Sequence, residues 1–304
     1  MKRDDKKWIG EKISVSMASR CNIYCVYCQG PNRGVEVDRG RVLERLDGGG
    51  VEAVNLEGDG EPTMNRDFFE WIDLLKSRGV KHISLSTNAV SLEDMDFCRR
   101  VEGCVDYFTI NIPAADEAMY RRVTRSVKFS KALRGIENLM ALGAGRKTRF
   151  YHNICRINYK RAPAFADWVL EKFPGISFVN FTFVRNLGRV RDDSAVLPTY
   201  GEAAPFVKVA LGRLKVKGKK AVIQNMPLCV LNAFEGFSYE FHRWRRGDKV
   251  LEEGVAAAAD SSKCRRCRLA DACAGARPDY LRVYGDGELV PSDRDPAGIA
   301  PEAF

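Results

Sequence analysis

The stretch Ile13-Ser-Val-Ser-Met-Ala-Ser-Arg-Cys21-Asn-Ile-Tyr-Cys25-Val-Tyr-Cys28 joins a strand pattern to three closely spaced cysteines. Alternation of apolar and polar residues over 13–17 predicts a β-strand with one buried face. The cysteines follow at once, so they lie in the loop at the carboxyl end of that strand, where α/β folds place their functional sites. Three thiolates this close can bind three irons of a cubane cluster and leave the fourth iron open to another ligand.

The first two thirds of the chain repeat this pairing of a strand with a helix. Apolar stripes of helical spacing mark 67–78 and 131–142, and 199–214 has the pattern of a further helix. The expected strands are 13–17, 52–57, 82–87, 106–112, 149–157 and 177–184. Repeated β–α units predict a parallel sheet covered by helices. Because a closed barrel of this kind has eight strands, we expect an α/β fold built as a partial (β/α)6 TIM-like barrel.

The expected strands alternate in polarity, whereas strands buried on both faces of a parallel sheet would be continuously apolar. The polar residues of one parity are Ser14, Ser16, Asn55, Glu57, Ser84, Ser86, Thr109, Asn111, Asn180 and Thr182. We therefore expect a curved sheet with an apolar face under helices and a wet concave face that binds a ligand. The strand at 149–157 is ambiguous, because either His152 and Arg156 or Asn153 and Cys155 could face inward.

The composition is that of a soluble globular protein, with 45% hydrophobic and 29% charged residues among 304. No apolar run reaches the roughly 18 residues of a membrane span. The N-terminus lacks the apolar region of a secretory signal, so we expect a cytoplasmic protein without a membrane partner. Ten cysteines in such a protein favour metal or redox chemistry over disulfides. The net charge of +9 allows an anionic partner, although an ordinary basic surface explains it more simply.

A second cysteine group lies near the C-terminus. Cys264, Cys267 and Cys273 have the spacing C-x2-C-x5-C, and Cys229 lies upstream. Four thiolates are a complete ligand set for a [4Fe–4S] cluster or for zinc. The chain accordingly divides into a basic leader over 1–12, a barrel over 13–198, a linker helix with a small second domain over 199–290, and a loosely ordered tail over 291–304.

The C-x3-C-x2-C spacing, with the aromatic Tyr27 before the last cysteine, resembles the signature of the radical S-adenosylmethionine (SAM) superfamily. The resemblance implies a [4Fe–4S] cluster on Cys21, Cys25 and Cys28, whose open iron is chelated by SAM. A zinc site would usually have a fourth cysteine or histidine nearby, and the sequence has none there. The superfamily core would extend over about 13–190.

Two segments that follow strands resemble SAM-binding segments of the superfamily. Gly58-Asp59-Gly60-Glu61-Pro62 is similar to the Gly-Gly-Glu-Pro segment that binds the methionine amino group, with Asp59 where the family pattern has glycine. Ser86-Thr87-Asn88 is similar to the Thr-Asn-Gly that closes the third strand in many members. Ala89 replaces that glycine, which argues against a left-handed turn at this point.

Single residues complete the expected site. Asn111, at the end of the fourth strand, is a candidate partner of the SAM ribose. Arg125 or Arg156 could pair with the SAM carboxylate, because arginine forms bidentate contacts with such groups, and ordinary surface arginines are the alternative. Cys155 could donate a hydrogen atom to a substrate radical if it faces the lumen, but a buried structural cysteine is the favoured interpretation.

The C-terminal cysteines, together with Tyr280-Leu-Arg-Val-Tyr-Gly-Asp, resemble the auxiliary-cluster (SPASM/twitch) region of radical SAM enzymes. The resemblance implies a small C-terminal domain with a second, auxiliary [4Fe–4S] cluster, and zinc remains an alternative. If Cys229 is not a ligand, the other three cysteines leave an open iron that could bind substrate, as in the molybdenum-cofactor cyclase. Four available cysteines favour full ligation and a role in electron transfer or structure.

The resemblance also implies a reaction. A reduced ferredoxin or flavodoxin supplies one electron, SAM is cleaved, and the resulting 5′-deoxyadenosyl radical abstracts hydrogen from a substrate. A peptide is the first choice of substrate, followed by a small metabolite or a nucleotide. A non-catalytic iron–sulfur or zinc protein that binds RNA is the alternative of a different class. Nucleic acid is the less favoured partner, because no RNA-binding motif is recognisable.

Overall fold

The computed structural model describes residues 11–18, 20–30, 38–248, 250 and 261–303. Two compact units divide the chain. The first comprises Met1–Tyr24, Gly30–Asn111 and Lys128–Thr148, and the second comprises Cys25–Gln29, Ile112–Val127 and Arg149–Phe304. Most of the leader expected over 1–12 lies outside the described residues.

The strands form one open sheet whose order follows the sequence, β1-β2-β3-β4-β5-β6-β7. Their bounds are Glu11–Ser16, Val51–Glu57, His82–Thr87, Tyr107–Asn111, Thr148–Ile154, Phe178–Phe183 and Ala221–Gln224. The registered pairs are parallel, so the expected α/β fold with a partial TIM-like barrel is confirmed. The expected count of strands was wrong by one, because β7 has only four residues, too few to show an alternating pattern.

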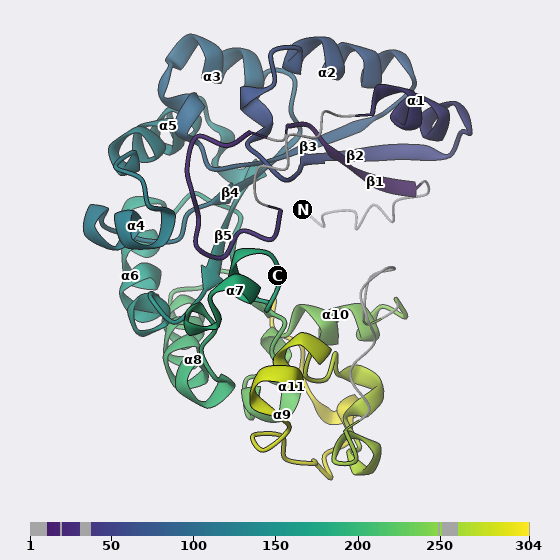
Figure 1. Cartoon of the computed structure of the whole chain (residues 1–304), viewed down its shortest axis with the longest axis vertical. Helices are drawn as coiled ribbons and strands as arrows, with labels where there is room; N and C mark the ends of the chain where they lie inside the picture. Colours follow the sequence, from purple (N-terminus) through teal and green to yellow (C-terminus); the bar gives the residue numbers. More distant parts are fainter. Residues whose placement is uncertain (1–10, 19, 31–37, 249, 251–260, 304) are drawn as a thin grey trace. The chain divides into compact units, whose positions relative to one another are not determined.

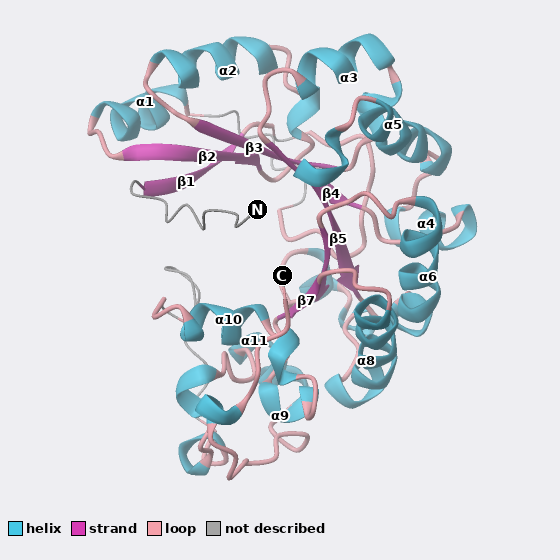
Figure 2. Cartoon of the chain, turned by 180° about the vertical axis from the view of Figure 1, so that it is seen from behind, coloured by secondary structure: helices cyan, strands magenta, loops and turns pink. Residues whose placement is uncertain are grey.

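In the first unit, amphipathic helices cover the apolar side of the strands. Figures 1 and 2 show α1, α2 and α3 on one side of β1, β2 and β3. The helices are α1 (Arg39–Asp47), α2 (Phe68–Ser77), α3 (Met95–Glu102) and α5 (Phe129–Ala141). Helix α2 buries Phe68, Trp71, Ile72 and Leu75, the stripe that its spacing predicts.

The second unit is richer in helices. They are α4 (Glu117–Thr124), α6 (Ala162–Lys172), α7 (Arg189–Asp192), α8 (Tyr200–Val216), α9 (Leu228–Leu231), α10 (Tyr239–Arg245) and α11 (Pro278–Tyr284). A capping box starts α8, since Thr199 and Glu202 each bond the other's backbone N–H. That local signal explains why the helix expected over 199–214 forms where it does.

The polar and apolar faces of the strands agree with the alternating pattern. In the first unit, Ser14 pairs with Asn55 and Asn55 with Ser84, and the Ser84 hydroxyl donates to Asn55 Oδ1 at 3.1 Å. The opposite parity, with Val15, Leu56 and Leu85, is buried. Polar side chains thus bond one another along a face of β2 and β3.

The ambiguous fifth strand is resolved in the second unit. Tyr151 pairs with Asn180, and its hydroxyl donates to Gln224 Oε1 at 2.8 Å, so Tyr151 and Asn153 share the polar face. His152 points the other way, and its ring lies tilted against Phe165 of α6, with ring centroids 3.9 Å apart. Its ring is buried, and this desolvation lowers the pKa of His152 to about 4, so it is neutral at physiological pH.

The chain's end differs from the expected loose tail. Ile299 is buried, Glu302 N donates to Gly236 O at 2.9 Å, and a short 3-10 turn spans Pro296–Gly298. Asp- and Pro-rich composition suggested disorder, but these backbone and side-chain contacts hold the segment against the second unit.

The turn after β3 also differs from expectation. Ala89 adopts the left-handed conformation, with φ 64° and ψ 0°, although alanine pays about 1–2 kcal/mol there. Tertiary contacts explain it. The Thr87 hydroxyl accepts from Ala89 N at 3.1 Å, and a Cβ on Gly135 of α5 would lie only 2.1 Å from Ala89 O. The helix packed on the turn fixes its conformation.

Candidate active site

The cysteine loop begins in the first unit, where the end of β3 holds it. Asn88 Nδ2 donates to Asn22 Oδ1 at 2.7 Å and to Cys21 Sγ at 3.7 Å. Lys128 Nζ donates to Asn22 O at 3.0 Å. Asn88 is buried, so its amide has a fixed position beside the first cysteine. The structure thereby brings together Cys21 and Asn88, which belong to two separate segments that resemble the superfamily.

The loop continues in the second unit, where the segment after β6 holds it. Arg189 N donates to Cys28 O at 3.0 Å, and Arg189 Nη1 donates to Cys25 O at 3.0 Å. Gly188 has φ 54°, and a Cβ there would lie 2.3 Å from Cys28 O. Only glycine permits this approach without displacing the backbone. Cys25 and Tyr27 are buried, whereas Cys28 is half-buried.

Sequence reasoning missed Gly188 and Arg189. The available signal was Asn186-Leu-Gly188-Arg189, a glycine-containing turn directly after a predicted strand and therefore at the carboxyl end of the sheet. Nothing in the local pattern said that its partner would be the cysteine loop some 160 residues earlier.

The Gly58-Asp59-Gly60-Glu61-Pro62 segment packs against the backbone that precedes Cys21. A Cβ on Gly60 would lie 2.3 Å from Arg20 O and 2.6 Å from Ala18 O. Gly58 has φ 141°, and a Cβ there would lie 2.3 Å from Ser16 Oγ. Glu61 N donates to Arg20 O at 2.8 Å. The glycines therefore permit a close approach between the ends of β1 and β2.

Glu61 ties this segment to the end of β3. Its side chain is 2% exposed and accepts from the Thr87 hydroxyl at 2.5 Å, Asn88 N at 2.8 Å and the Thr63 hydroxyl at 2.7 Å. Pro62 begins the 3-10 turn Pro62–Met64. Burial raises the pKa of the Glu61 carboxyl, while these donors act in the opposite direction.

Replacing Glu61 by glutamine is expected to flatten the pH dependence of stability. Because the native pKa lies above the ordinary 4.5, the native state binds the proton more tightly than the unfolded chain does. The resulting stability is fully present below about pH 4.5 and is lost as pH rises through the native pKa. Urea denaturation from pH 4.5 to neutrality should show a smaller loss of unfolding free energy in Glu61→Gln than in wild type. An identical slope would contradict a raised pKa.

The remaining predicted residues lie in different surroundings. Ser86 Oγ is 3.4 Å from Asn55 Oδ1 on the polar face, and Asn111 ends β4. Arg125 is exposed, in a left-handed conformation at the end of α4. None of these placements tests a role in SAM binding, so these roles stay predictions.

Arg156 and Cys155 are committed to contacts within the second unit. Arg156 Nη1 pairs with Glu202 Oε1 at 2.6 Å, and Nη2 donates to Leu197 O at 3.0 Å and to Tyr284 Oη at 3.2 Å. Cys155 has no exposed surface, and burial raises the pKa of its thiol to about 11. A hydrogen-donor role for Cys155 would require the surrounding side chains to open.

The second cysteine group surrounds one cavity of the second unit. Cys229, Cys264, Cys267 and Cys273 all line this cavity of about 290 Å³, together with Leu269, Leu289 and Val290. The sequence spacing predicted that these four cysteines group together, and the structure places all four around this cavity.

Backbone N–H groups point at these sulfurs. Leu228 N and Gly275 N donate to Cys273 Sγ at 3.3 and 3.2 Å, and Ser292 N donates to Cys267 Sγ at 3.3 Å. Such donors stabilise thiolates and tune iron–sulfur clusters. Burial raises the pKa of the Cys273 thiol to about 12, so the group is a neutral thiol unless a metal binds. Among the described residues, no three cysteine, histidine or carboxylate side chains are gathered closely enough for a single metal ion.

The family model of the radical SAM superfamily matches residues 15–169, just over half of the chain. The chain belongs to the radical SAM superfamily. Radical SAM proteins are enzymes that use a [4Fe–4S] cluster and SAM, and the predicted membership in this superfamily is thereby confirmed. No helix in the described part of this radical SAM enzyme is long and apolar enough to span a membrane.

Curated relatives of this radical SAM enzyme are named probable GTP 3′,8-cyclases. The protein of Methanococcus maripaludis is 26% identical over 163 residues, which are 51% of this chain and 53% of that one. The protein of Methanopyrus kandleri is 34% identical over 141 residues, 43% of this chain and 44% of that one. The chain thus spans about half the length of the curated relatives it matches.

Solved structures share the fold of this radical SAM enzyme. Streptococcus suis SuiB bound to S-adenosylmethionine has a TM-score of 0.58 and 12% identity, covering 93% of this chain and 76% of that one. Native anSMEcpe with bound AdoMet and Kp18Cys peptide has a TM-score of 0.58 and 15% identity, covering 78% and 67%. At such identities the likeness concerns the fold alone.

Proposed function

We propose that this radical SAM enzyme abstracts hydrogen from a small metabolite or a nucleotide. The observation that carries the proposal is the similarity of its core to proteins named probable GTP 3′,8-cyclases. A peptide, the first choice from sequence, has weaker support, because the peptide-bound structure is similar at only 15% identity. The polar face of the strands suits a hydrogen-bonding substrate.

We propose that Cys21, Cys25 and Cys28 bind the [4Fe–4S] cluster. The cluster and SAM together supply a 5′-deoxyadenosyl radical when an electron arrives. Asn88 and Arg189 hold the loop at its two ends through the contacts described above. The close packing of Gly60 on Arg20 O supports the proposed role of Gly58-Asp59-Gly60-Glu61-Pro62 as the seat of SAM, since it fixes the turn beside the cysteine loop.

We propose that Cys229, Cys264, Cys267 and Cys273 bind a second, auxiliary [4Fe–4S] cluster. The shared cavity and the N–H donors to sulfur support it. Four cysteines can ligate the four irons of a [4Fe–4S] cluster, and zinc remains the alternative. With Cys229 as the fourth ligand the cluster would be fully ligated and suited to electron transfer.

Replacing Cys273 by alanine is the test of the auxiliary cluster. Reconstituted wild type should hold about eight irons per chain, and the variant about four, because each cubane holds four irons. The difference should also remove one [4Fe–4S] signal from the electron paramagnetic resonance spectrum of the reduced protein. About four irons in both proteins, with zinc present, would overturn the second cluster.

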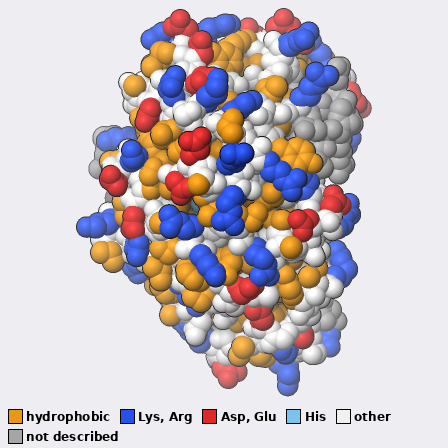
Figure 3. Space-filling model, turned by 60° about the vertical axis from the view of Figure 1, so that its left-hand side comes forward, with side chains coloured by type: hydrophobic (Ala, Val, Ile, Leu, Met, Phe, Trp, Pro, Cys, Tyr) orange, Lys and Arg blue, Asp and Glu red, His pale blue; other side chains and the backbone are white. Residues whose placement is uncertain are grey.

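The proposed partners follow from this chemistry. Low-potential electron transfer suits a ferredoxin or flavodoxin donor, and ten free thiols suit the reducing cytoplasm. On the face shown in Figure 3, lysine and arginine side chains are interspersed with aspartate and glutamate. That mixture supports an ordinary basic surface more than a nucleic-acid interface.

The deciding experiment is SAM cleavage. The full chain is reconstituted with iron and sulfide without oxygen, reduced with dithionite and given SAM, and 5′-deoxyadenosine is measured by mass spectrometry. Nucleotides and short peptides are then added separately, and stimulation by nucleotides alone is expected. Full iron loading with no 5′-deoxyadenosine would leave the non-catalytic alternative, and stimulation by peptides alone would overturn the proposed substrate class.

A further inference from the structure

We propose that Arg185 and Arg277 form a subsite for a phosphate group of the substrate. The proposal rests on the proposed function only in assigning that phosphate to a small-molecule substrate. Both residues belong to the second unit. Arg185 follows β6 by two positions, and Arg277 caps the start of α11 and bonds Asn225, the residue after β7. Carboxyl ends of parallel strands are where α/β folds bind ligands.

Arg277 is buried, and two nitrogens of its guanidinium group make no hydrogen bond to the described residues. The residue is 6% exposed, and Nη2 donates to Asn225 Oδ1 at 2.8 Å. Its Nε and Nη1 have no hydrogen-bond partner among the described residues. Buried donors are normally satisfied, so the N–H groups on these two nitrogens need an acceptor that the described residues do not provide.

Arg185 adds a third open nitrogen and lies partly at the surface. Its Nη2 donates to Asp279 Oδ1 at 3.1 Å, while Nε is buried and has no partner in the part of the chain that is described. The side chain as a whole is 18% exposed, so part of Arg185 lies at the surface next to its buried Nε. Asp279 also accepts from Asn186 N at 2.7 Å, which holds Arg185 and its loop in place.

Asn225 and Glu240 fix the geometry on the other side. Asn225 has φ 63°, donates its N–H to Glu240 Oε1 at 2.8 Å and donates Nδ2 to Phe183 O at 3.3 Å. Arg277 Nη2 lies 3.8 Å from Glu240 Oε1. These contacts link β6, β7, α10 and Arg277, so the open donors sit on a rigid support.

Each of the two guanidinium groups has one carboxylate neighbour, and their open N–H donors favour an anionic ligand. Two guanidinium groups lie near each other, and Arg185 helps to lower the pKa of Arg277, after the larger effect of burial. Asp279 is engaged by Arg185 and Asn186, and burial raises the pKa of Glu240, which weakens it as a counter-charge. The three open guanidinium nitrogens, Arg185 Nε, Arg277 Nε and Arg277 Nη1, carry four N–H bonds, and a phosphate offers more acceptor oxygens to them than a carboxylate does.

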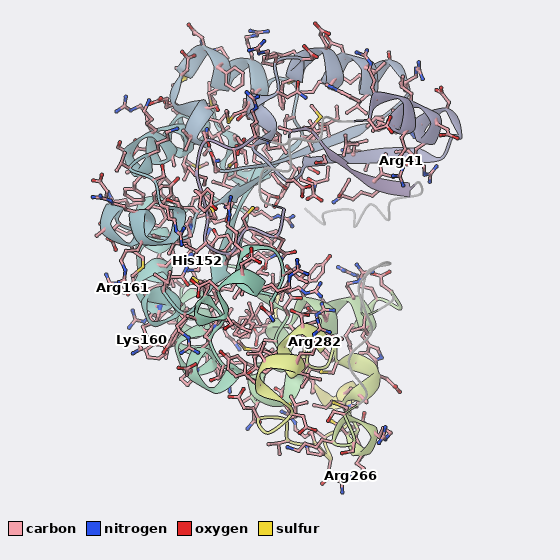
Figure 4. The ribbon with its side chains drawn as sticks, viewed as in Figure 1. Arg41, His152, Lys160, Arg161, Arg266 and Arg282 are labelled. Atoms are coloured by element: carbon pink, nitrogen blue, oxygen red, sulfur yellow. The ribbon has the colours of Figure 1, made fainter. Side chains whose placement is uncertain are left out.

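The test measures binding to the full, reconstituted chain by titration calorimetry, with tripolyphosphate as the probe and acetate as the carboxylate comparison. Arg277→Gln and Arg185→Gln should each weaken tripolyphosphate binding at least about tenfold, as expected for loss of a charge-assisted contact. Arg282→Gln is the matched control, because Arg282 lies exposed in the last turn of the same helix α11 (Figure 4), and its binding should equal wild type.

Equal binding in wild type and both variants, or preference for acetate, would overturn the subsite. If circular dichroism shows that Arg277→Gln does not fold, tripolyphosphate binding is instead compared in Arg277→Lys, which keeps the charge, and in Arg185→Gln, whose position is only half-buried. SAM cleavage without substrate is measured on the same samples. If SAM is cleaved but the variants bind tripolyphosphate as well as wild type does, only the subsite is refuted. If the variants bind tripolyphosphate more weakly but SAM is not cleaved, only the proposed function is refuted.

Discussion

Replacing Cys21 by alanine is expected to remove the SAM-binding cluster and the activity together. Iron should fall by about four per chain, and 5′-deoxyadenosine formation should drop by at least about a thousandfold, because two thiolates hold a cubane poorly and the electron path to SAM is lost. The measurement is iron content with a single-turnover assay after identical anaerobic reconstitution. SAM binding, followed by equilibrium dialysis, should weaken in parallel.

Cys104→Ala is the matched control for this result. Cys104 is a half-buried thiol of the first unit, and its Sγ donates to Val101 O at 3.3 Å. The control should keep wild-type iron and activity. A Cys21→Ala protein that retains full iron and forms 5′-deoxyadenosine would refute the assignment of the first cysteine motif.

Gly60→Ala is expected to produce the second-largest loss. The added Cβ would meet Arg20 O at 2.3 Å and Ala18 O at 2.6 Å, closer than real Cβ atoms come to such groups. Both obstacles are backbone atoms, so either the turn or the segment before Cys21 must shift. A displacement of about 1 Å at a reacting site can lower rates about a hundredfold, and we expect a loss of that order in SAM cleavage.

Gly175→Ala controls for the substitution itself. A Cβ added at Gly175 would meet no atom within 4 Å, and the backbone of Gly175 is not left-handed. Its variant should match wild type in SAM cleavage and thermal stability. If Gly60→Ala cleaves SAM at the wild-type rate while folded, the turn can move without consequence and its proposed role as the SAM seat fails.

Much of the fold was predictable because local pattern carries it. The stripe Phe68, Trp71, Ile72 and Leu75 is buried as its spacing predicts, and serine, asparagine and threonine share one face of the strands. Strand β7 escaped prediction because four residues cannot display a period. The left-handed conformation of Ala89 was not predicted, because alanine disfavours it. The packing of α5 on that turn enforces it.

The candidate site divides in the same way. The cysteine motif and the segment that contains Gly60 were recognisable from residue type and spacing, and the family match confirms the superfamily to which they belong. Three hydrogen bonds of the site join residues from 67 to 164 positions apart: Asn88 to Cys21, Arg189 to Cys25, and Arg185 to Asp279. No pattern of neighbours along the chain records such contacts.

The sequence by itself determined the chemistry that this protein can attempt: thiolates at cluster spacing, glycines after strands, and strands with one wet face. The tertiary structure alone decided which backbone groups hold the cysteine loop, which carboxylates are already engaged and which arginine donors stay open. Periodicity and motif spacing depend on neighbours in the chain, whereas satisfaction of a buried polar group depends on whatever the fold brings beside it.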